Sequence, residues 1–202
     1  METADVDPGL STAVSARKRP RPGERRAQIL QCLAGMLEEG GADRVTTAAL
    51  AQRLHVSEAA LYRHFASKAQ MFDALIDFIE HSMFGLINQI HAQHDSGLNQ
   101  AQRTMQALLA FGVRNPGLCR VLAGGALVGE NARLQQRVDQ FLERVEAALR
   151  QSLRLAREQN ALQADPAQRA QWLMTYAGGC LLRVARGHPA PDAESALHAL
   201  LG

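Results

Sequence analysis

Apolar residues recur along most of this chain at intervals of three and four, the spacing that places them on one face of an α-helix. The first run predicts a helix over about Glu24–Glu39, which Gly40-Gly41 end. A longer run after Ser67 predicts a helix whose buried stripe extends from Met71 to Met83. No segment alternates apolar and polar residues with a β-branched bias, so the pattern predicts no sheet.

Beyond a polar break around His94–Gly97, the helical periodicity continues toward the end of the chain. Asp165 and Pro166 are typical of a helix start, as the cap and the first helical residue. The predicted elements are a helix over about 99–115, a short turn at Leu118–Leu122, a glycine-rich bend at Gly124-Gly125, and helices over about 131–160, 166–186 and 192–200. The predicted fold class is therefore all-α.

The segment from Arg44 to Lys68 has the pattern of a helix-turn-helix. Thr46-Thr47 open a short helix, His55-Val56 turn the chain, and Ser57 is placed to cap a second helix that carries hydroxyl, phenol, guanidinium and imidazole groups. Such side chains suit phosphates and base edges in a major groove. An ordinary helical hairpin is the alternative. The residues assigned to DNA contact are Thr46, Thr47, Ser57, Glu58, Ala59, Tyr62, Arg63, His64 and Lys68.

The charge distribution favours DNA over the hairpin alternative. The net charge of the 202 residues is only +2, but residues 17–70 hold ten bases against five acids, whereas residues 71–202 hold twelve of each. The positive surplus therefore coincides with the helix-turn-helix and the segment before it, as polyanion binding requires. Lys68 stands in the first turn of a helix, where the helix dipole disfavours a cation. A docked phosphate would remove that penalty, so Lys68 is predicted to clamp the DNA backbone.

Residues 1–23 lack helical periodicity and contain several prolines and glycines, which predicts a disordered arm. The arm ends in the basic cluster Arg17-Lys18-Arg19 with Arg21. It either tracks phosphates or a minor groove, or is merely a solvated tail. The predicted domains are this arm, a helix-turn-helix domain over 24–66, and a helical body over 67–202.

The helix predicted near the C-terminus carries small residues beside aromatic ones. Trp172, Tyr176 and Gly179 lie in this patch, which lets a second helix approach closely. Two such helices from two-fold-related subunits would form a four-helix dimer interface, and packing within one subunit is the alternative. A symmetric dimer also suits a palindromic duplex DNA site.

The sequence offers no constellation typical of catalysis, so no enzyme activity and no cofactor are predicted. Cys32, Cys119 and Cys180 lie far apart in apolar helical contexts, as reduced core thiols of a cytosolic protein would. His91 and His94 lack a third strong ligand nearby, so no metal site is assigned. Neither a signal peptide nor a membrane span is predicted.

The predicted three-helix module, long connecting helix and helical body resemble the TetR family of regulators. The matching residues are Thr46-Thr47, Leu50-Ala51, Val56-Ser57, Leu61-Tyr62-Arg63-His64-Phe65 and Ser67-Lys68. They cover about a quarter of the chain. The resemblance implies a TetR-like fold with a C-terminal dimerisation body, but it does not identify the effector. A small-molecule-responsive repressor is therefore one possible function.

A closer resemblance, to the nucleoid occlusion factors within that family, extends over nearly the whole chain after residue 24. It is carried by the segments SEAALYRHF (57–65), MFDALIDFIEHS (71–82), FGVRNPGL (111–118) and ALVGENARLQQRVDQFLERVEAALRQ (126–151). It implies a nucleoid-associated dimer that, when DNA-bound, antagonises assembly of the division GTPase FtsZ, with the possibility of more than one dimer per site.

The same resemblance implies a contact surface for the acidic, apolar FtsZ tail at Phe78, Arg114 and Asn115. Phe78 lies at the edge of the apolar stripe, and Arg114 is suited to a carboxylate. The alternatives are that Phe78 belongs to the core and that Arg114 and Asn115 bind helix-terminal carbonyls. Leu86 stands where well-known members carry an arginine, and Ala110 where they carry glycine.

Overall fold

The computed structural model describes residues 23–40 and 45–201. The predicted arm lies outside these residues except for Gly23, as does Arg44. The elements are α1 (Glu24–Gly40), α2 (Thr47–Arg53), α3 (Glu58–Tyr62), α4 (Lys68–Gln93), α5 (Gly97–Arg114), α6 (Pro116–Leu122), the 3₁₀ helix η2 (Gly125–Leu127), α7 (Ala132–Glu158), α8 (Pro166–Ala185) and α9 (Ala193–Leu201). The described part of the chain contains no strand, and the all-α prediction is confirmed.

Capping side chains begin the helices where the sequence places them. The side chains of Ser67, Asn131 and Asp165 accept hydrogen bonds from backbone N–H groups in the first turns of α4, α7 and α8. The prediction of a turn at Leu118–Leu122 is wrong, because these residues belong to α6. Pro116 sits in the first turn of α6, and the side chains of Leu118, Cys119, Val121 and Leu122 are buried. An apolar face and a favourable first residue therefore extend a helix through this short segment.

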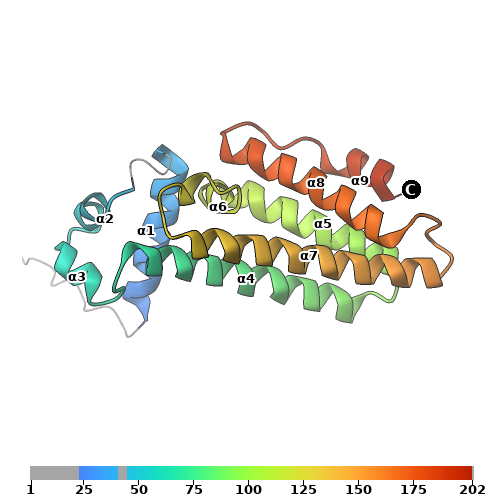
Figure 1. The fold of residues 1–202 in the computed structure, drawn as a ribbon, viewed down its shortest axis with the longest axis horizontal. Coiled ribbons are helices and arrows are strands. Elements are labelled where there is room, and N and C mark those ends of the chain that lie inside the picture. The colour runs from blue at the N-terminus through green and yellow to red at the C-terminus, as the bar shows by residue number, and fades with distance from the viewer. Residues whose placement is uncertain (1–22, 41–44, 202) are drawn as a thin grey trace, which may run out of the picture.

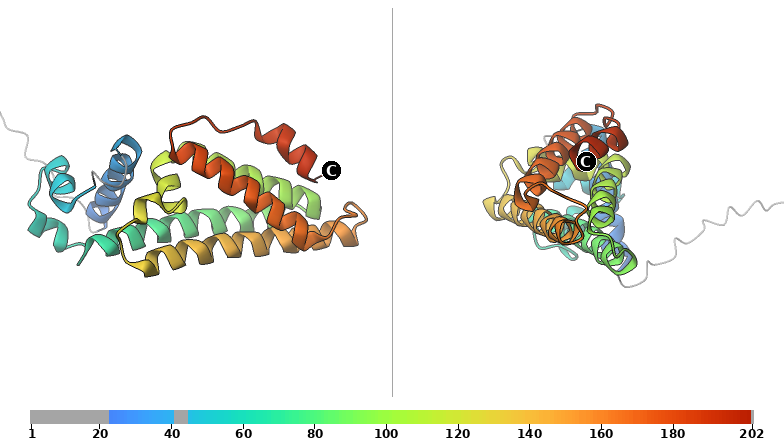
Figure 2. Two further views of the ribbon diagram at one scale, coloured as in Figure 1. Left: turned by 45° about the horizontal axis from the view of Figure 1, so that its top comes forward. Right: turned by 90° about the vertical axis from the view of Figure 1, so that its right-hand side faces the viewer.

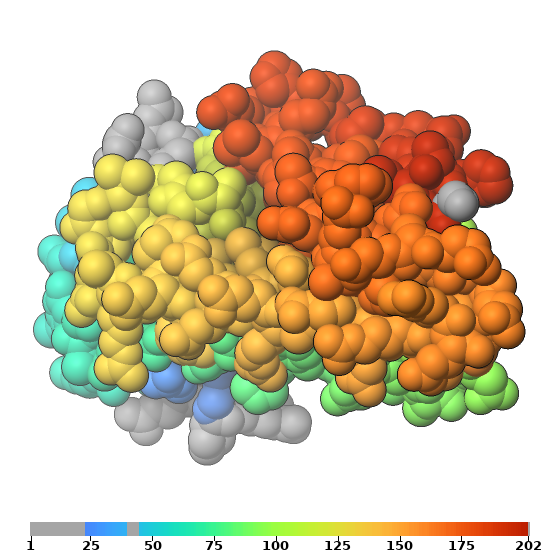
Figure 3. Space-filling model, turned by 45° about the vertical axis from the view of Figure 1, so that its right-hand side comes forward, coloured from blue at the N-terminus to red at the C-terminus, as the bar shows by residue number. Residues whose placement is uncertain are grey.

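Four long helices form the body. In the end-on view of Figure 2, α4, α5, α7 and α8 lie around a common centre, and α9 packs on α5 and α8. The side chains that these helices direct toward one another form one apolar core. The helices pack together because each has an apolar face, as α7 illustrates. Its apolar residues repeat every three or four positions and are fully or almost fully buried: Leu134, Val138, Phe141, Val145, Leu149 and Leu153. Figure 3 shows α7 and α8 side by side on one outer face.

The helix-turn-helix lies at one end of the molecule and is joined to the body through α1 and α4 (Figure 1). α1 packs along α6 and against the first half of α4. The closest approach is at Gly117 on α6, where a Cβ atom would lie 2.2 Å from the carbonyl oxygen of Ala34 on α1. Only glycine fits this contact, which positions the DNA-binding end on the body.

An ion-pair cluster fixes α7 against α4. The guanidinium of Arg137 on α7 contacts Asp73, Asp77 and Glu80 on α4, at N–O distances of 2.6, 2.7 and 2.9 Å. Burial opposes the charge of Arg137, but hydrogen bonds from the guanidinium to Asp73 and Asp77 outweigh it and raise its pKa. Because the three acids lie on one flank of α4, that flank faces α7.

Candidate DNA interface and partner surface

Hydroxyl caps shape the helix-turn-helix as predicted. The side-chain oxygens of Thr46 and Ser57 accept hydrogen bonds from the N–H groups of Ala49 and Ala60, at 3.1 and 3.2 Å. Between the two helices His55 has a φ of 54°, in the left-handed region, which reverses the chain within a few residues. Leu50, Ala51 and Leu61 are buried beneath, so the module presents α3 outward on an apolar base.

The predicted DNA-contact residues of α2 and α3 differ in their exposure and in whether their side chains are already hydrogen-bonded. Tyr62 is 44% exposed, and Glu58, Ala59 and Arg63 are also exposed. The Oγ1 atom of Thr47 donates to Oε2 of Glu58 at 2.7 Å, so these two assigned contacts satisfy each other and tie α2 to α3. This leaves Tyr62 and Arg63 as the accessible large side chains of the predicted recognition helix.

The second helix is shorter than the sequence indicated. It ends at Tyr62, so His64 follows the helix and is half-buried. The buried ring of Phe65, which lies 4.0 Å beneath the guanidinium of Arg26, anchors the chain after the helix. Arg26 also donates to the carbonyl of His64. The Arg26 guanidinium thus stabilises the end of the DNA-binding module and is already engaged within the protein, so it is not assigned to phosphate binding.

Lys68 has a partner within the protein. Its Nζ atom lies 2.7 Å from Oε1 of Glu130, in the loop before α7, and the two side chains are 30% and 16% exposed. No local pattern in the sequence indicates this contact, because the two residues are far apart in the chain. A phosphate that binds Lys68 must compete with Glu130.

We therefore expect Glu130→Gln to strengthen DNA binding. Loss of the competing carboxylate should raise operator affinity about twofold to fivefold, the range for a partly exposed ion pair. One additional phosphate contact should also steepen the plot of log affinity against log salt by about 0.9. Titration of labelled operator DNA at several salt concentrations measures both, with Lys68→Gln as the opposite control. Unchanged affinity and slope would remove Lys68 from the interface.

The residues assigned to the partner surface lie on the body. Phe78 on α4 is 52% exposed, so it is not a core residue. Arg114 ends α5 and is exposed, and its side chain makes no hydrogen bond and no ion pair among the described residues. Asn115 behaves differently, because its Nδ2 atom donates to the carbonyl of Phe111 at 2.8 Å and thereby satisfies a helix-terminal group.

Position 78 and position 114 lie at similar levels of the body. α4 and α5 are antiparallel neighbours joined by the short connection 94–96. Phe78 precedes this connection by about as many residues as Arg114 follows it. The exposed Phe78 and the exposed Arg114 therefore lie at one level of two neighbouring helices, in the half of the body nearer the DNA-binding module.

The assigned dimer residues are spaced by four and three positions along α8, so they fall on one face of this helix. Trp172 is 46% exposed, and at Gly179 a Cβ atom would meet nothing within 4 Å. Leu182, which the sequence analysis did not single out, is 38% exposed on the same side and borders an apolar hollow of about 200 Å³ with Leu142. Tyr176 shares this face but is half-buried, and its hydroxyl lies 3.5 Å from the carbonyl oxygen of Asp192 in the α8–α9 loop.

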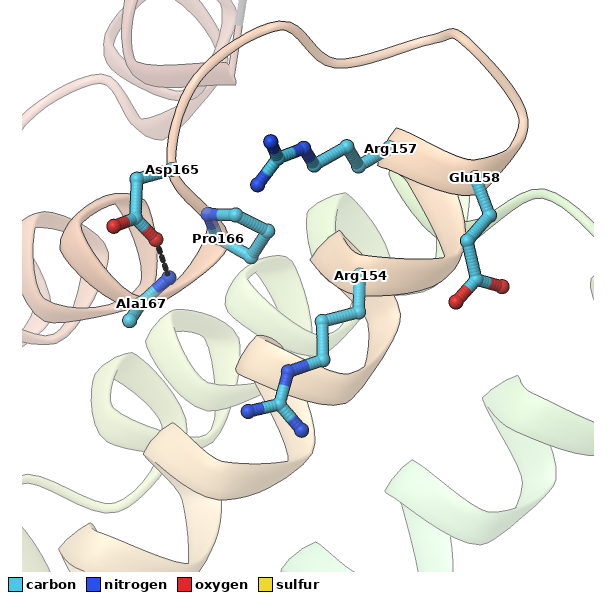
Figure 4. A pocket seen from close by; sticks show the side chains of 6 residues that line it. All are labelled: Arg154, Arg157, Glu158, Asp165, Pro166 and Ala167. Carbon is cyan, nitrogen blue, oxygen red and sulfur yellow. Dashed lines mark hydrogen bonds between the residues drawn. The ribbon is translucent and has the colours of Figure 1, made fainter.

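The far end of the body carries charged residues without a recognisable site. Arg154 and Arg157 at the end of α7 and Asp165 before α8 line a hollow of about 340 Å³. Figure 4 shows these residues, with the Asp165 carboxylate accepting a hydrogen bond from the N–H of Ala167. His91 lies 3.1 Å from the hydroxyl of Ser152, and burial lowers its pKa. No group of three potential metal ligands occurs among the described residues.

Of the three cysteines predicted to lie in the core, Cys119 and Cys180 are buried, whereas Cys32 is only half-buried. Cys32, Cys119 and Cys180 are all free thiols. Burial raises the pKa of the Cys119 thiol to about 12, and its Sγ atom donates to the carbonyl of Gly112. None of the helices in the described ranges is long and apolar enough to span a membrane.

Fold and interface together define a DNA-binding regulator of the helix-turn-helix class. Residues 29–75 match the model of the bacterial regulatory proteins of the tetR family, and residues 95–191 match the SlmA-like tetracyclin repressor-like C-terminal domain. A TetR family transcriptional regulator, PfmR from Thermus thermophilus, aligns with a TM-score of 0.73 at 19% identity, covering 86% of this chain and 97% of its own. A TetR-like regulator from a Rhodococcus species aligns at 0.74 and 21%, covering 91% and 96%.

Sequence relatives narrow the family. The nucleoid occlusion factor SlmA of Vibrio cholerae is 50% identical over 165 residues, covering 80% of this chain and 84% of the relative. SlmA of Cronobacter sakazakii is 46% identical over 187 residues, covering 89% and 94%. The chain therefore belongs to the SlmA family of nucleoid occlusion factors, within the TetR family of regulators.

Proposed function

We propose that this protein is a nucleoid-associated dimer that binds palindromic chromosomal sites and, when bound, antagonises FtsZ assembly over the chromosome. The observation that carries the proposal is an exposed Phe78 at the level of Arg114, whose side chain has no partner among the described residues, in a chain that belongs to the SlmA family. An aromatic ring beside a guanidinium that the described residues leave free suits a peptide that is both apolar and acidic.

The DNA-binding part of the proposal rests on the helix-turn-helix at 24–66. Tyr62 and Arg63 are accessible at the end of α3, and the cap residues Thr46 and Ser57 lie at helix N-termini, where backbone N–H groups favour phosphates. The body, 67–202, would supply the dimer interface through the face of α8 that holds Trp172, the open glycines and Leu182. Two modules then address two half-sites of a palindrome.

A small-molecule-responsive repressor receives less support. Such a protein needs a pocket with convergent polar groups. The buried polar side chains among the described residues are Gln100, Thr104 and Ser152. Gln100 donates to the carbonyl of His94, and Ser152 contacts His91, so only Thr104 of these three lacks a partner. One unsatisfied hydroxyl is a poor basis for ligand recognition.

The direct test measures FtsZ polymerisation by light scattering. We expect the protein with operator DNA to reduce the scattering of GTP-driven filaments strongly, and the protein without DNA to reduce it much less. Tyr62→Ala should weaken operator binding about tenfold or more, and the variant should lose the DNA-dependent reduction in scattering. The substitution removes an exposed side chain that is predicted to contact DNA and leaves the buried core intact. Scattering that is the same with and without protein plus DNA would refute the proposal.

A further inference from the structure

A row of four residues on α5 combines two arginines with two alanines. Arg103, Ala107, Ala110 and Arg114 are spaced by four, three and four positions, so they fall within an arc of about 60° on the helix. Arg103 and Arg114 are exposed, and the alanines between them are half-buried. The row thus presents two guanidinium groups on either side of a low, apolar stretch.

This row borders the flank of α4 that carries exposed apolar side chains. Asp73, Asp77 and Glu80 mark the flank of α4 that faces α7. Phe78 and Leu86, which are 52% and 40% exposed, lie on the other flank, toward α5. Counted from the connection at 94–96, Leu86 is level with Arg103, as Phe78 is level with Arg114. Each arginine therefore has an exposed apolar side chain opposite it.

Both arginines are electrostatically available. The side chains of Arg103 and Arg114 make no hydrogen bond and no ion pair within the described ranges. The acids of the facing helix, Asp73, Asp77 and Glu80, are bound to Arg137 on its opposite flank. No described carboxylate of α4 thus neutralises the row. Beyond Arg114 the surface continues into an apolar hollow of about 280 Å³, which Ala110 and Val113 border.

We infer that Arg103 is a second anchoring cation for the acidic peptide, and that it sets the register of that peptide along α4 and α5. This inference rests on the proposed function. Eleven residues of helix separate the Cα atoms of Arg103 and Arg114 by about 16 Å, which an extended peptide spans in about five residues. The surface therefore selects a segment with two carboxylates about five positions apart and apolar residues between them. Leu86 supplies apolar contact, and Arg103 supplies the charge.

The test uses a fluorescently labelled peptide with the sequence of the FtsZ C-terminal tail and the full-length protein bound to operator DNA. We expect Arg103→Glu to weaken peptide binding at least tenfold in an anisotropy titration, with operator affinity unchanged. Arg154→Glu is the matched control, because Arg154 is also exposed but lies at the far end of the body. It should change peptide binding less than twofold.

Peptides in which each acidic residue is replaced by its amide separate contact from indirect effects. Replacement of one acidic residue should weaken peptide binding to the wild-type protein but not to the Arg103→Glu variant. Replacement of a second acidic residue, about five positions away, should weaken binding to the wild-type protein but not to the Arg114→Asp variant. Equal peptide affinity of wild type and Arg103→Glu would overturn the inference and leave the proposed function standing. Loss of operator binding by Arg103→Glu would also overturn it. No binding of the peptide to the wild-type complex would contradict the proposed function itself.

Discussion

Gly117→Ala is expected to destabilise the protein by about 3 kcal/mol and to weaken operator binding more than tenfold. The added Cβ atom would lie 2.2 Å from the carbonyl oxygen of Ala34 and 3.0 Å from the N atom of Glu38. Both are backbone atoms of α1, so the clash cannot be relieved by a side-chain rotation. α6 must then move away from α1, which holds the DNA-binding module against the body.

Gly35→Ala provides the control on α1, the helix against which Gly117 of α6 packs. At Gly35 a Cβ atom would meet nothing within 4 Å, so the substitution should stabilise α1 by about 0.5–1 kcal/mol. Urea denaturation followed by circular dichroism gives both stabilities, and titration with operator DNA gives both affinities. Similar stabilities for the two alanine variants would show that the α1–α6 contact is looser than the geometry at Gly117 indicates.

Arg114→Asp is expected to abolish the antagonism of FtsZ while operator affinity stays within about twofold of wild type. The substitution reverses a charge that has no partner among the described residues, so the fold loses no hydrogen bond or ion pair of this side chain, whereas a peptide carboxylate would meet repulsion in place of attraction. Phe78→Ala should have the same selective effect by removing exposed apolar area that only a partner buries. FtsZ sedimentation with operator-bound variants measures the loss.

Val128→Ala is the matched control for Phe78→Ala. Val128 is 81% exposed in the loop before α7, so it tests whether any exposed apolar truncation reduces the effect. We expect the Val128 variant to inhibit FtsZ as the wild type does. Parallel loss of operator binding and FtsZ inhibition in the Arg114 or Phe78 variants would instead indicate misfolding and would remove these residues from the partner surface.

The sequence predicted the elements with strong local signals. Hydroxyl caps at Thr46, Ser57 and Ser67 and the proline after Asp165 mark helix starts that the structure confirms. The 3.6-residue periodicity identified the long helices. It did not identify α6, since seven residues are too few to show a repeat. The sequence predicted a helix end at about position 115, because a proline and a glycine follow at 116 and 117. However, proline is favourable in the first turn of a helix, and Gly117 allows α6 to pack on α1.

Contacts between residues far apart in the sequence could not be predicted from local sequence patterns. Nothing near Lys68 indicates that Glu130 lies within 2.7 Å, and nothing near Arg26 indicates its contact with the carbonyl of His64. Exposure was similarly undetermined: Phe78 and Tyr176 are both aromatic residues on predicted helices, but one is half open to solvent and the other lies against the α8–α9 loop. Their roles as partner and dimer contacts stay predictions.

The cluster around Arg137 constrains how binding at one end of the molecule reaches the other. Its three carboxylates extend from Asp73 to Glu80, about two turns of α4, so α4 cannot rotate or slide along α7 without breaking charged contacts. If DNA binding at Lys68 displaced α4, then α4 and α7 would therefore move together as one rigid unit. No ion pair among the described residues joins α4 to α5. Movement of α4 and α7 relative to α5 would therefore change the distance between Phe78 and Arg114.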